Sequence, residues 1–241
     1  MIVMRNVFMR IRQSRALAPV LAAAGTAVCL TVGVQICAVE AAATGPAAGQ
    51  MVSAPLAGEA LLQAIEVYKP DSNYRDDAYV LAAVKEAAQG WREHNGGIGA
   101  CLVQEDTGEI VERAHNSQYV PYFRSDLHAE MQLMDRYEDR LKLSRSDPAR
   151  GKLRDLRGVV LYTSVEPCPM CLARLINAGV KKVYYAASDE QGGMAKHMDA
   201  LPPYWKQMAE GMSVEPSRSS PALNAMAKGL FHPMHPANAA H

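Results

Sequence analysis

Two cysteines three residues apart, with a histidine and a glutamate about forty residues upstream, are the side chains in this sequence best suited to metal chemistry. The segment EPCPMC contains Cys168 and Cys171, and the segment HAE contains His128 and Glu130. Two thiolates and one imidazole are a frequent zinc ligand set, and a helix start stabilises thiolates through its unpaired backbone amides. The pattern offers no fourth protein ligand. We therefore predict a catalytic zinc centre with one position open to solvent, because a structural site would be closed.

The spacing of Glu130 from His128 constrains the geometry of this centre. Two residues correspond to about 200° around an ideal helix, so in mid-helix the two side chains would face different directions. The sequence alone does not explain how they converge, and we place them in a first helical turn, where the geometry is looser and the glutamate is long enough to reach round. From there the carboxylate could take a proton from water and later protonate a departing amine. We predict that Glu130 is the proton shuttle.

Hydrophobic periodicity predicts the elements that position these residues. A continuous apolar strand, a helix that starts at Cys168 and ends before Gly179, and a second strand follow one another with short connections. This order favours a parallel strand pair and an α/β sandwich. The expected helices cover residues 58–68, 76–91, 127–143, 168–178 and 204–210, and the expected strands cover 98–103, 110–114, 158–162 and 182–187. Strands 98–103 and 110–114 read as a hairpin.

The beginning and end of the sequence differ in composition from the middle. Residues 1–43 contain four arginines, an apolar run and an A-x-A cleavage pattern, which are typical of a signal peptide. The run is also long enough for an uncleaved membrane anchor. Both interpretations predict an exported protein, periplasmic or secreted, with membrane contact only through this segment. The expected organisation continues with a linker and short helix (44–72), a catalytic domain (73–210) and a flexible C-terminal tail (211–241).

Charge and cysteine content narrow the function further. Residues 44–241 contain 21 basic and 24 acidic residues, a net charge of minus three. This balance disfavours a large nucleic-acid substrate, which requires a concentrated basic face. Of the five cysteines, Cys101 lies in an apolar strand pattern and is expected in the core. In an oxidising compartment, a disulfide between Cys168 and Cys171 competes with metal capture.

The pairing of HAE with PCPMC, in the order hairpin, helix, strand, helix, resembles the cytidine deaminase-like superfamily. Residues 161–171, LYTSVEPCPMC, are most similar to the branch of guanine deaminases and tRNA adenosine deaminases, and the resemblance covers about residues 76–210. It implies a three-layer α/β/α sandwich with a mixed central sheet. It also implies Zn²⁺ on His128, Cys168 and Cys171, Glu130 as proton shuttle, and a homodimer.

The resemblance implies substrate contacts as well. Asn116, at the end of the hairpin, matches a family asparagine that hydrogen-bonds the base. The strand entrance resembles the family segment P-x-G-A, although Gly97 replaces the proline. The remaining substrate-binding residues implied by the motifs are Gly99, Ala100, Ala129 and Pro167. The loop before HAE departs from the commoner polar pattern because it contains Tyr119, Tyr122 and Phe123.

The implied activity is zinc-dependent hydrolytic deamination of a nucleobase or nucleoside, with release of ammonia and a guanine-like purine as the favoured substrate. A tRNA adenosine deaminase is the nearest alternative, since it shares the catalytic residues, but the expected export and the acidic balance count against it. A thiol-disulfide oxidoreductase is a second alternative, because Cys-Pro-Met-Cys at a helix start is a credible redox motif. His128 and Glu130 favour zinc over this redox function.

Overall fold

The computed structural model describes residues 57–144, 156 and 158–231. The expected leader (1–43) and residues 44–56 of the expected linker lie outside these residues. Within the described part of the chain, no helix combines the length and the apolar character needed to cross a membrane.

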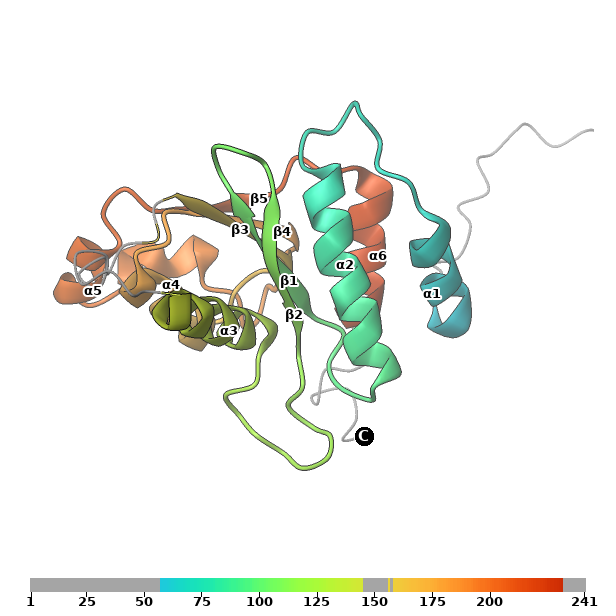
Figure 1. Cartoon of the computed structure of the whole chain (residues 1–241), viewed down its shortest axis with the longest axis horizontal. Helices are drawn as coiled ribbons and strands as arrows, with labels where there is room; N and C mark the ends of the chain where they lie inside the picture. Colours follow the sequence, from blue (N-terminus) through green and yellow to red (C-terminus); the bar gives the residue numbers. More distant parts are fainter. Residues whose placement is uncertain (1–56, 145–155, 157, 232–241) are drawn as a thin grey trace, which may run out of the picture. The chain divides into compact units, whose positions relative to one another are not determined.

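A five-stranded mixed sheet forms the centre of the fold, in the order β2-β1-β3-β4-β5 (Figure 1). β1 pairs antiparallel with both β2 and β3, whereas β3, β4 and β5 are parallel. The predicted hairpin and the predicted parallel pair are therefore confirmed. The strands are β1 (Gly99–Gln104), β2 (Ile110–His115), β3 (Val159–Val165), β4 (Lys182–Ala187) and β5 (Ser213–Pro216).

Helices cover both faces of the sheet, because alternate strand residues point to opposite sides. Cys101 and Val103 pack with α1, α2 and α6, whereas Ala100 and Leu102 pack with α3 and α4 (Figure 1). This arrangement confirms the three-layer α/β/α sandwich. The helices on the first face are α1 (Gly58–Val67), α2 (Asp77–Arg92) and α6 (Pro221–Phe231), and those on the second are α3 (Ala129–Ser144) and α4 (Pro169–Ala178).

The flexible tail predicted from residue 211 onward is wrong for residues 213–231. β5 extends the parallel sheet beside β4, and α6 packs its apolar stripe of Leu223, Ala227 and Leu230 into the core. These positions have the i, i+4, i+7 spacing of an amphipathic helix. Pro221 occupies the first helical position, where its missing N–H costs nothing. The Ser, Pro and Ala content of this segment therefore marked turns and a helix start rather than a tail.

Buried carboxylates attach this C-terminal segment to the start of α2. Asp77 Oδ1 accepts a hydrogen bond from the Ser220 backbone N–H at 2.6 Å, and its Oδ2 accepts one from the Tyr68 hydroxyl at 2.7 Å. Burial raises the pKa of Asp77, but backbone N–H groups of Asp71 and Ser220 outweigh it, so the net pKa lies below its ordinary value. Asp77 is therefore an ionised link between the two ends of the domain.

The chain between β4 and β5 completes the second face. A 3₁₀ helix (Ala195–Ala200) is followed by α5 (Pro203–Met208), close to the helix predicted at 204–210. Leu172 and Ile176 of α4 pack with Trp205 of α5 in a small cluster of their own. The Met194 N–H donates to Pro167 O at 3.0 Å, which places the loop that follows β4 beside the start of α4.

Candidate active site

A cavity of about 590 Å³ lies where the carboxyl end of β3, the starts of α3 and α4, and the end of α6 meet. Its wall combines segments that are far apart in sequence. Its lining residues are Gly96, Gly97, Ile98, Asn116, Gln118, Tyr119, Phe123, His128, Glu130, Val165, Glu166, Cys168, Cys171, Asp189, Gly192 and Phe231. All four residues predicted for the zinc centre and its proton shuttle are among them.

The three predicted metal ligands converge in this cavity. His128 immediately precedes α3, and its Nδ1 lies 3.6 Å from Cys168 Sγ and 3.5 Å from Cys171 Sγ. The three ligand atoms lie within 4.8 Å of one another. One imidazole and two thiolates match the chemistry of a zinc site, and no other His, Cys, Asp or Glu of the described chain joins this cluster. The donor set therefore fits a zinc ion with one position left open.

Local sequence explains why the two thiols face the histidine. Pro169 stands at the first position of α4, Cys168 is its N-cap in an extended conformation, and Cys171 lies in the first turn. A hydrogen bond from the Cys171 thiol, assisted by His128, lowers the pKa of Cys168 to about 4. The hydrogen bond with Cys168, together with burial, raises the pKa of Cys171. A metal ion that binds both sulfurs would displace any remaining thiol proton.

Glu130 is buried beside the ligands, with 3% of its surface exposed. Its Oε2 accepts a hydrogen bond from the Cys171 thiol at 3.3 Å, and its Oε1 accepts one from the Thr163 hydroxyl at 3.0 Å. Burial raises the pKa of the carboxyl group. Since α3 begins at Ala129, Glu130 lies in the first turn as predicted, and His128 lies directly before the helix.

Asn116, the predicted base-binding residue, lies on the cavity wall directly after β2 and is 2% exposed. Its backbone N–H donates to Ile98 O at 2.9 Å, which attaches it to the segment before β1. Its Oδ1 accepts a hydrogen bond from the Gln118 backbone N–H, and its Nδ2 donates to Gln118 Oε1, both at 2.8 Å. The carboxamide is therefore held in one orientation.

The four other predicted substrate contacts are not among the residues that line the cavity. A Cβ atom on Gly99 would lie 2.3 Å from Ala83 O, so this glycine permits close packing of β1 against α2. Ala100 and Ala129 are fully buried in the hydrophobic core. Pro167 accepts a hydrogen bond through its carbonyl from the Met194 N–H at 3.0 Å. The cavity wall is formed instead by the preceding residues 96–98.

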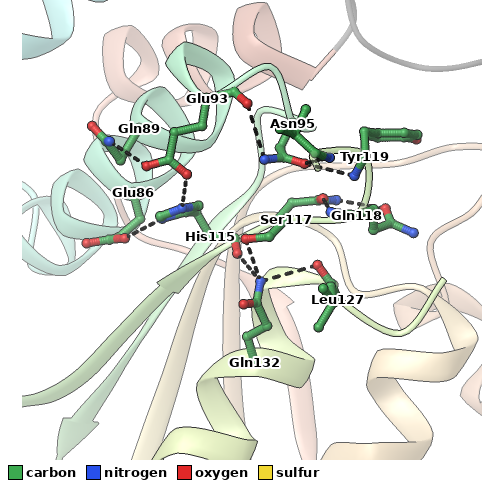
Figure 2. Close-up of polar contacts among 12 residues, drawn as sticks. Glu86, Gln89, Glu93, Asn95, His115, Ser117, Gln118, Tyr119, Leu127 and Gln132 are labelled. Atoms are coloured by element: carbon green, nitrogen blue, oxygen red, sulfur yellow. Dashed lines mark hydrogen bonds and ion pairs between the residues drawn. The ribbon is translucent and has the colours of Figure 1, made fainter. Parts of the chain in front are cut away.

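The loop of residues 117–127, hereafter the aromatic loop, brings Tyr119 and Phe123 to the cavity, with ring centroids 5.8 Å apart. Tyr122, the third predicted aromatic residue, is 67% exposed and does not line the cavity. Asn95 Oδ1 accepts hydrogen bonds from the Tyr119 and Val120 backbone N–H groups at 2.8 and 3.1 Å. Figure 2 shows Asn95 beside Tyr119. The loop is thus fixed at its start from the end of α2.

Gln132, in the first turns of α3, supports both ends of the aromatic loop. Its Nε2 donates to Ser117 Oγ at 3.1 Å and to Leu127 O at 3.3 Å, and it also contacts His115 O (Figure 2). Ser117 N–H donates to Leu127 O at 3.0 Å, which closes the loop base. The helix that carries Glu130 therefore also holds the loop that supplies the aromatic side chains.

Several cavity residues were not predicted from the sequence. Glu166 is buried and accepts hydrogen bonds from the backbone N–H groups of Asp189 and Ala195, at 3.2 and 2.9 Å. A Cβ atom on Gly193 would lie 2.4 Å from Glu166 Cδ, so the Gly192-Gly193 pair was the available signal for this close approach. Phe231 enters the cavity from the end of α6, which the sequence pattern had assigned to a tail.

Comparisons with known proteins agree with this geometry. The model of the cytidine and deoxycytidylate deaminase zinc-binding region matches residues 73–187. A tRNA-specific adenosine deaminase of Bacillus subtilis is 38% identical over 119 residues, which cover 49% of this chain and 66% of that protein. A tRNA-specific adenosine deaminase of Aquifex aeolicus is 31% identical over 116 residues, with coverages of 48% and 68%. The chain thus spans about two thirds of the length of these curated relatives.

Among solved structures, the guanine deaminase from Bacillus subtilis is similar to this chain with 30% sequence identity and a TM-score of 0.37. The similarity covers 46% of this chain and 63% of that one.

Proposed function

The chain belongs to the cytidine deaminase-like superfamily, and from that premise we propose that it catalyses the zinc-dependent hydrolytic deamination of a guanine-like purine base or its nucleoside. In this reaction, water adds to the ring carbon that carries the amino group. The carbon–nitrogen bond then breaks, and the products are the corresponding carbonyl compound and ammonia. Deamination is the activity of the family, whereas the choice of substrate is the proposal.

The observation that carries the proposal is the convergence of His128, Cys168 and Cys171 beside a buried carboxyl group on an accessible cavity. A zinc ion held by these residues would supply the Lewis acidity that lowers the pKa of water to about 7. Asn116 lies on the wall of the same cavity. Ligands, proton acceptor and base-binding amide therefore border one space.

Proton transfer is the part of the chemistry assigned to Glu130. Its carboxylate takes a proton from the attacking water and passes it to a ring nitrogen of the base. It then takes the second proton from the hydroxyl group of the adduct and gives it to the departing amine, so that ammonia leaves and the carbonyl forms. Burial raises the pKa of Glu130 toward neutral pH. Proton transfer is most efficient when the pKa of the catalytic group lies near the working pH. The Thr163 hydroxyl holds Oε1, so the orientation of the carboxylate is set before the substrate binds.

Binding of the base is assigned to the wall residues. Asn116 has a lone pair on Oδ1 and one N–H on Nδ2 beyond those that Gln118 engages, and both can pair with the edge of a planar base. Tyr119 and Phe123 offer aromatic faces against which the ring can stack. Carboxylates of Glu166 and Asp189 favour a substrate rich in N–H donors, which is a property of guanine.

Two features support a small substrate. Among the described residues that line the cavity, none is a lysine or an arginine, so phosphate groups would find no cation there. Residues 44–241 also carry a net charge of minus three. The export expected from residues 1–43 is part of this proposal, because it would separate the protein from cytoplasmic tRNA.

A tRNA adenosine deaminase remains the second candidate. It is favoured by the two bacterial relatives at 38% and 31% identity, both described as tRNA-specific adenosine deaminases. The same catalytic residues would serve this reaction.

One assay separates these functions. The purified protein is analysed for zinc, and ammonia release is followed with guanine, adenine, cytosine and their nucleosides, while inosine is measured in tRNA. We expect one zinc ion per chain and ammonia from guanine or guanosine, with Glu130→Gln as the inactive control. Inosine in tRNA without ammonia from the small substrates would establish the second candidate. A zinc-free protein that cycles a Cys168–Cys171 disulfide would support the thiol oxidoreductase instead.

A further inference from the structure

Gln118 holds both polar atoms of the Asn116 carboxamide. Its backbone N–H donates to Asn116 Oδ1 and its side-chain Oε1 accepts from Asn116 Nδ2, both at 2.8 Å. Gln118 is 9% exposed and lines the same cavity. The two ends of an asparagine amide are a donor and an acceptor of almost equal size, so only such contacts decide which end lies where.

Gly96 also restricts the Asn116 carboxamide. A Cβ atom on Gly96 would lie 3.0 Å from Asn116 Nδ2, so the backbone of Gly96 packs closely against the amide. Asn116 is therefore restricted by both Gly96 and Gln118, and it lines the cavity. Its unused lone pair and N–H are the groups left to contact a base.

Gln118 also connects Asn116 to the far side of the aromatic loop. Its Nε2 donates to Ser125 O at 3.3 Å, and its carbonyl accepts from the Arg124 N–H at 2.7 Å. Figure 2 places Gln118 within the polar group that surrounds Ser117 and Tyr119. One residue thus links the base-binding amide to the segment that carries Phe123.

We propose that Gln118 is a positioning residue that determines base selectivity, because it fixes the donor and acceptor ends of Asn116 and ties this amide to the aromatic loop. This inference rests on the proposed function. An amide held in one orientation accepts a base edge of matching pattern and rejects the reversed pattern, because the rejected edge leaves buried polar groups unpaired. An amide free to turn over would accept both.

Three variants test the proposal. Gln118→Met has similar volume but loses both side-chain contacts, to Asn116 Nδ2 and to Ser125 O, while the backbone N–H still donates to Asn116 Oδ1. Gln118→Glu keeps the acceptor for Asn116 Nδ2 and loses the donor to Ser125. Gln63→Met, at an exposed position of α1, is the matched control. For Gln118→Met we expect kcat/KM on the preferred base to fall about tenfold, mainly through KM. The selectivity ratio between that base and the next best should move toward one, and Gln118→Glu should restore this ratio.

A second measurement does not depend on turnover. NMR spectra of isotopically labelled protein give the solvent-exchange rate of the Asn116 side-chain amide, whose signal is identified by its loss in Asn116→Asp. We expect about tenfold faster exchange in Gln118→Met than in the wild type, and no change in Gln63→Met.

The two measurements distinguish failure of the inference from failure of the proposed function. If the wild-type protein deaminates none of the bases, the proposed function fails, and amide exchange still decides whether Gln118 positions Asn116. Unchanged exchange in Gln118→Met overturns the inference. An equal loss of activity on all bases, which Gln118→Glu does not restore, also overturns it, because a general loosening of the fold would give that result.

Discussion

Cys171 Sγ donates a hydrogen bond to Glu130 Oε2 across 3.3 Å, so a predicted zinc ligand and the predicted proton shuttle are in direct contact. The contact joins the first turn of α4 to the first turn of α3. The contact places the carboxylate beside the residues that would hold a zinc ion.

Replacement of Glu130 by glutamine should separate metal binding from catalysis. The amide keeps the size of the carboxylate but cannot accept the proton, so we expect a loss of about 10²-fold to 10⁴-fold in kcat. Zinc content, measured by elemental analysis, should stay at the wild-type value. A variant that retains activity, or that loses its zinc, would contradict the role assigned to this residue.

Thiol reactivity should distinguish Cys168 from Cys101 in metal-free protein. At about pH 6, Cys168, with its pKa of about 4, is a thiolate and should be alkylated, whereas burial raises the pKa of Cys101 to about 12 and leaves it protonated. Addition of zinc should protect Cys168. Peptide mass spectrometry after alkylation measures both sites, and unprotected Cys168 in zinc-loaded protein would exclude it as a ligand.

Most of the fold could be predicted because the sequence signals for its strands and helices are local, and the tertiary contacts keep these elements as predicted. The apolar run of β3, the proline at the start of α4 and Gly179 at its end are each local signals. They gave the strand, helix and strand around the cysteines in the right order. The candidate zinc ligands could be predicted from spacing and residue type, because a Cys-x-x-Cys pair with one histidine is a frequent zinc donor set.

The parts that were missed depend on contacts between distant segments. Phe231 reaches the cavity only because α6 packs against α2, and no motif near residue 231 indicates this. Gly99 matched a substrate-side motif, yet its missing side chain serves helix packing. Gln118 has no motif at all, and its importance follows only from the two atoms of Asn116 that it contacts.

His115 should make stability depend on pH. Its ring lies between Glu86 and Glu93, with both nitrogen–oxygen distances 3.0 Å, and the hydrogen bond to Glu86 is the main cause of its raised pKa (Figure 2). Because the folded pKa exceeds the unfolded value, this stabilisation is complete below about pH 6.5 and is lost as pH rises through the folded pKa.

Urea unfolding of wild type and His115→Gln at about pH 6 and about pH 9 tests this expectation. The stability difference between the two proteins should shrink at the higher pH. Its size should stay near or below about 1 kcal/mol, because solvent reaches the carboxylates and screens the pair. A difference that is independent of pH would show that His115 does not titrate in this range.

Asp77 should be important for stability rather than for chemistry. Asp77→Ala leaves the Ser220 and Asp71 backbone N–H groups without their acceptor, so we expect a loss of about 3 kcal/mol in unfolding free energy. Asp106→Ala, at an exposed turn, is the control and should change stability by less than about 0.5 kcal/mol. Because the pKa of Asp77 is lowered, its contribution is present above the unfolded pKa and disappears as pH falls through the folded pKa.

The proposed zinc ligands and the selective wall of the cavity come from different kinds of backbone. Cys168 and Cys171 follow β3. Every residue of β3 is buried, so substitutions in this strand would disturb the core. Five of the sixteen lining residues come from the aromatic loop and from residues 188–194. Loops of this kind run over the surface and tolerate change. Mutagenesis libraries confined to these two loops should therefore yield variants with altered substrate range and intact metal binding, which makes the scaffold suitable for directed evolution.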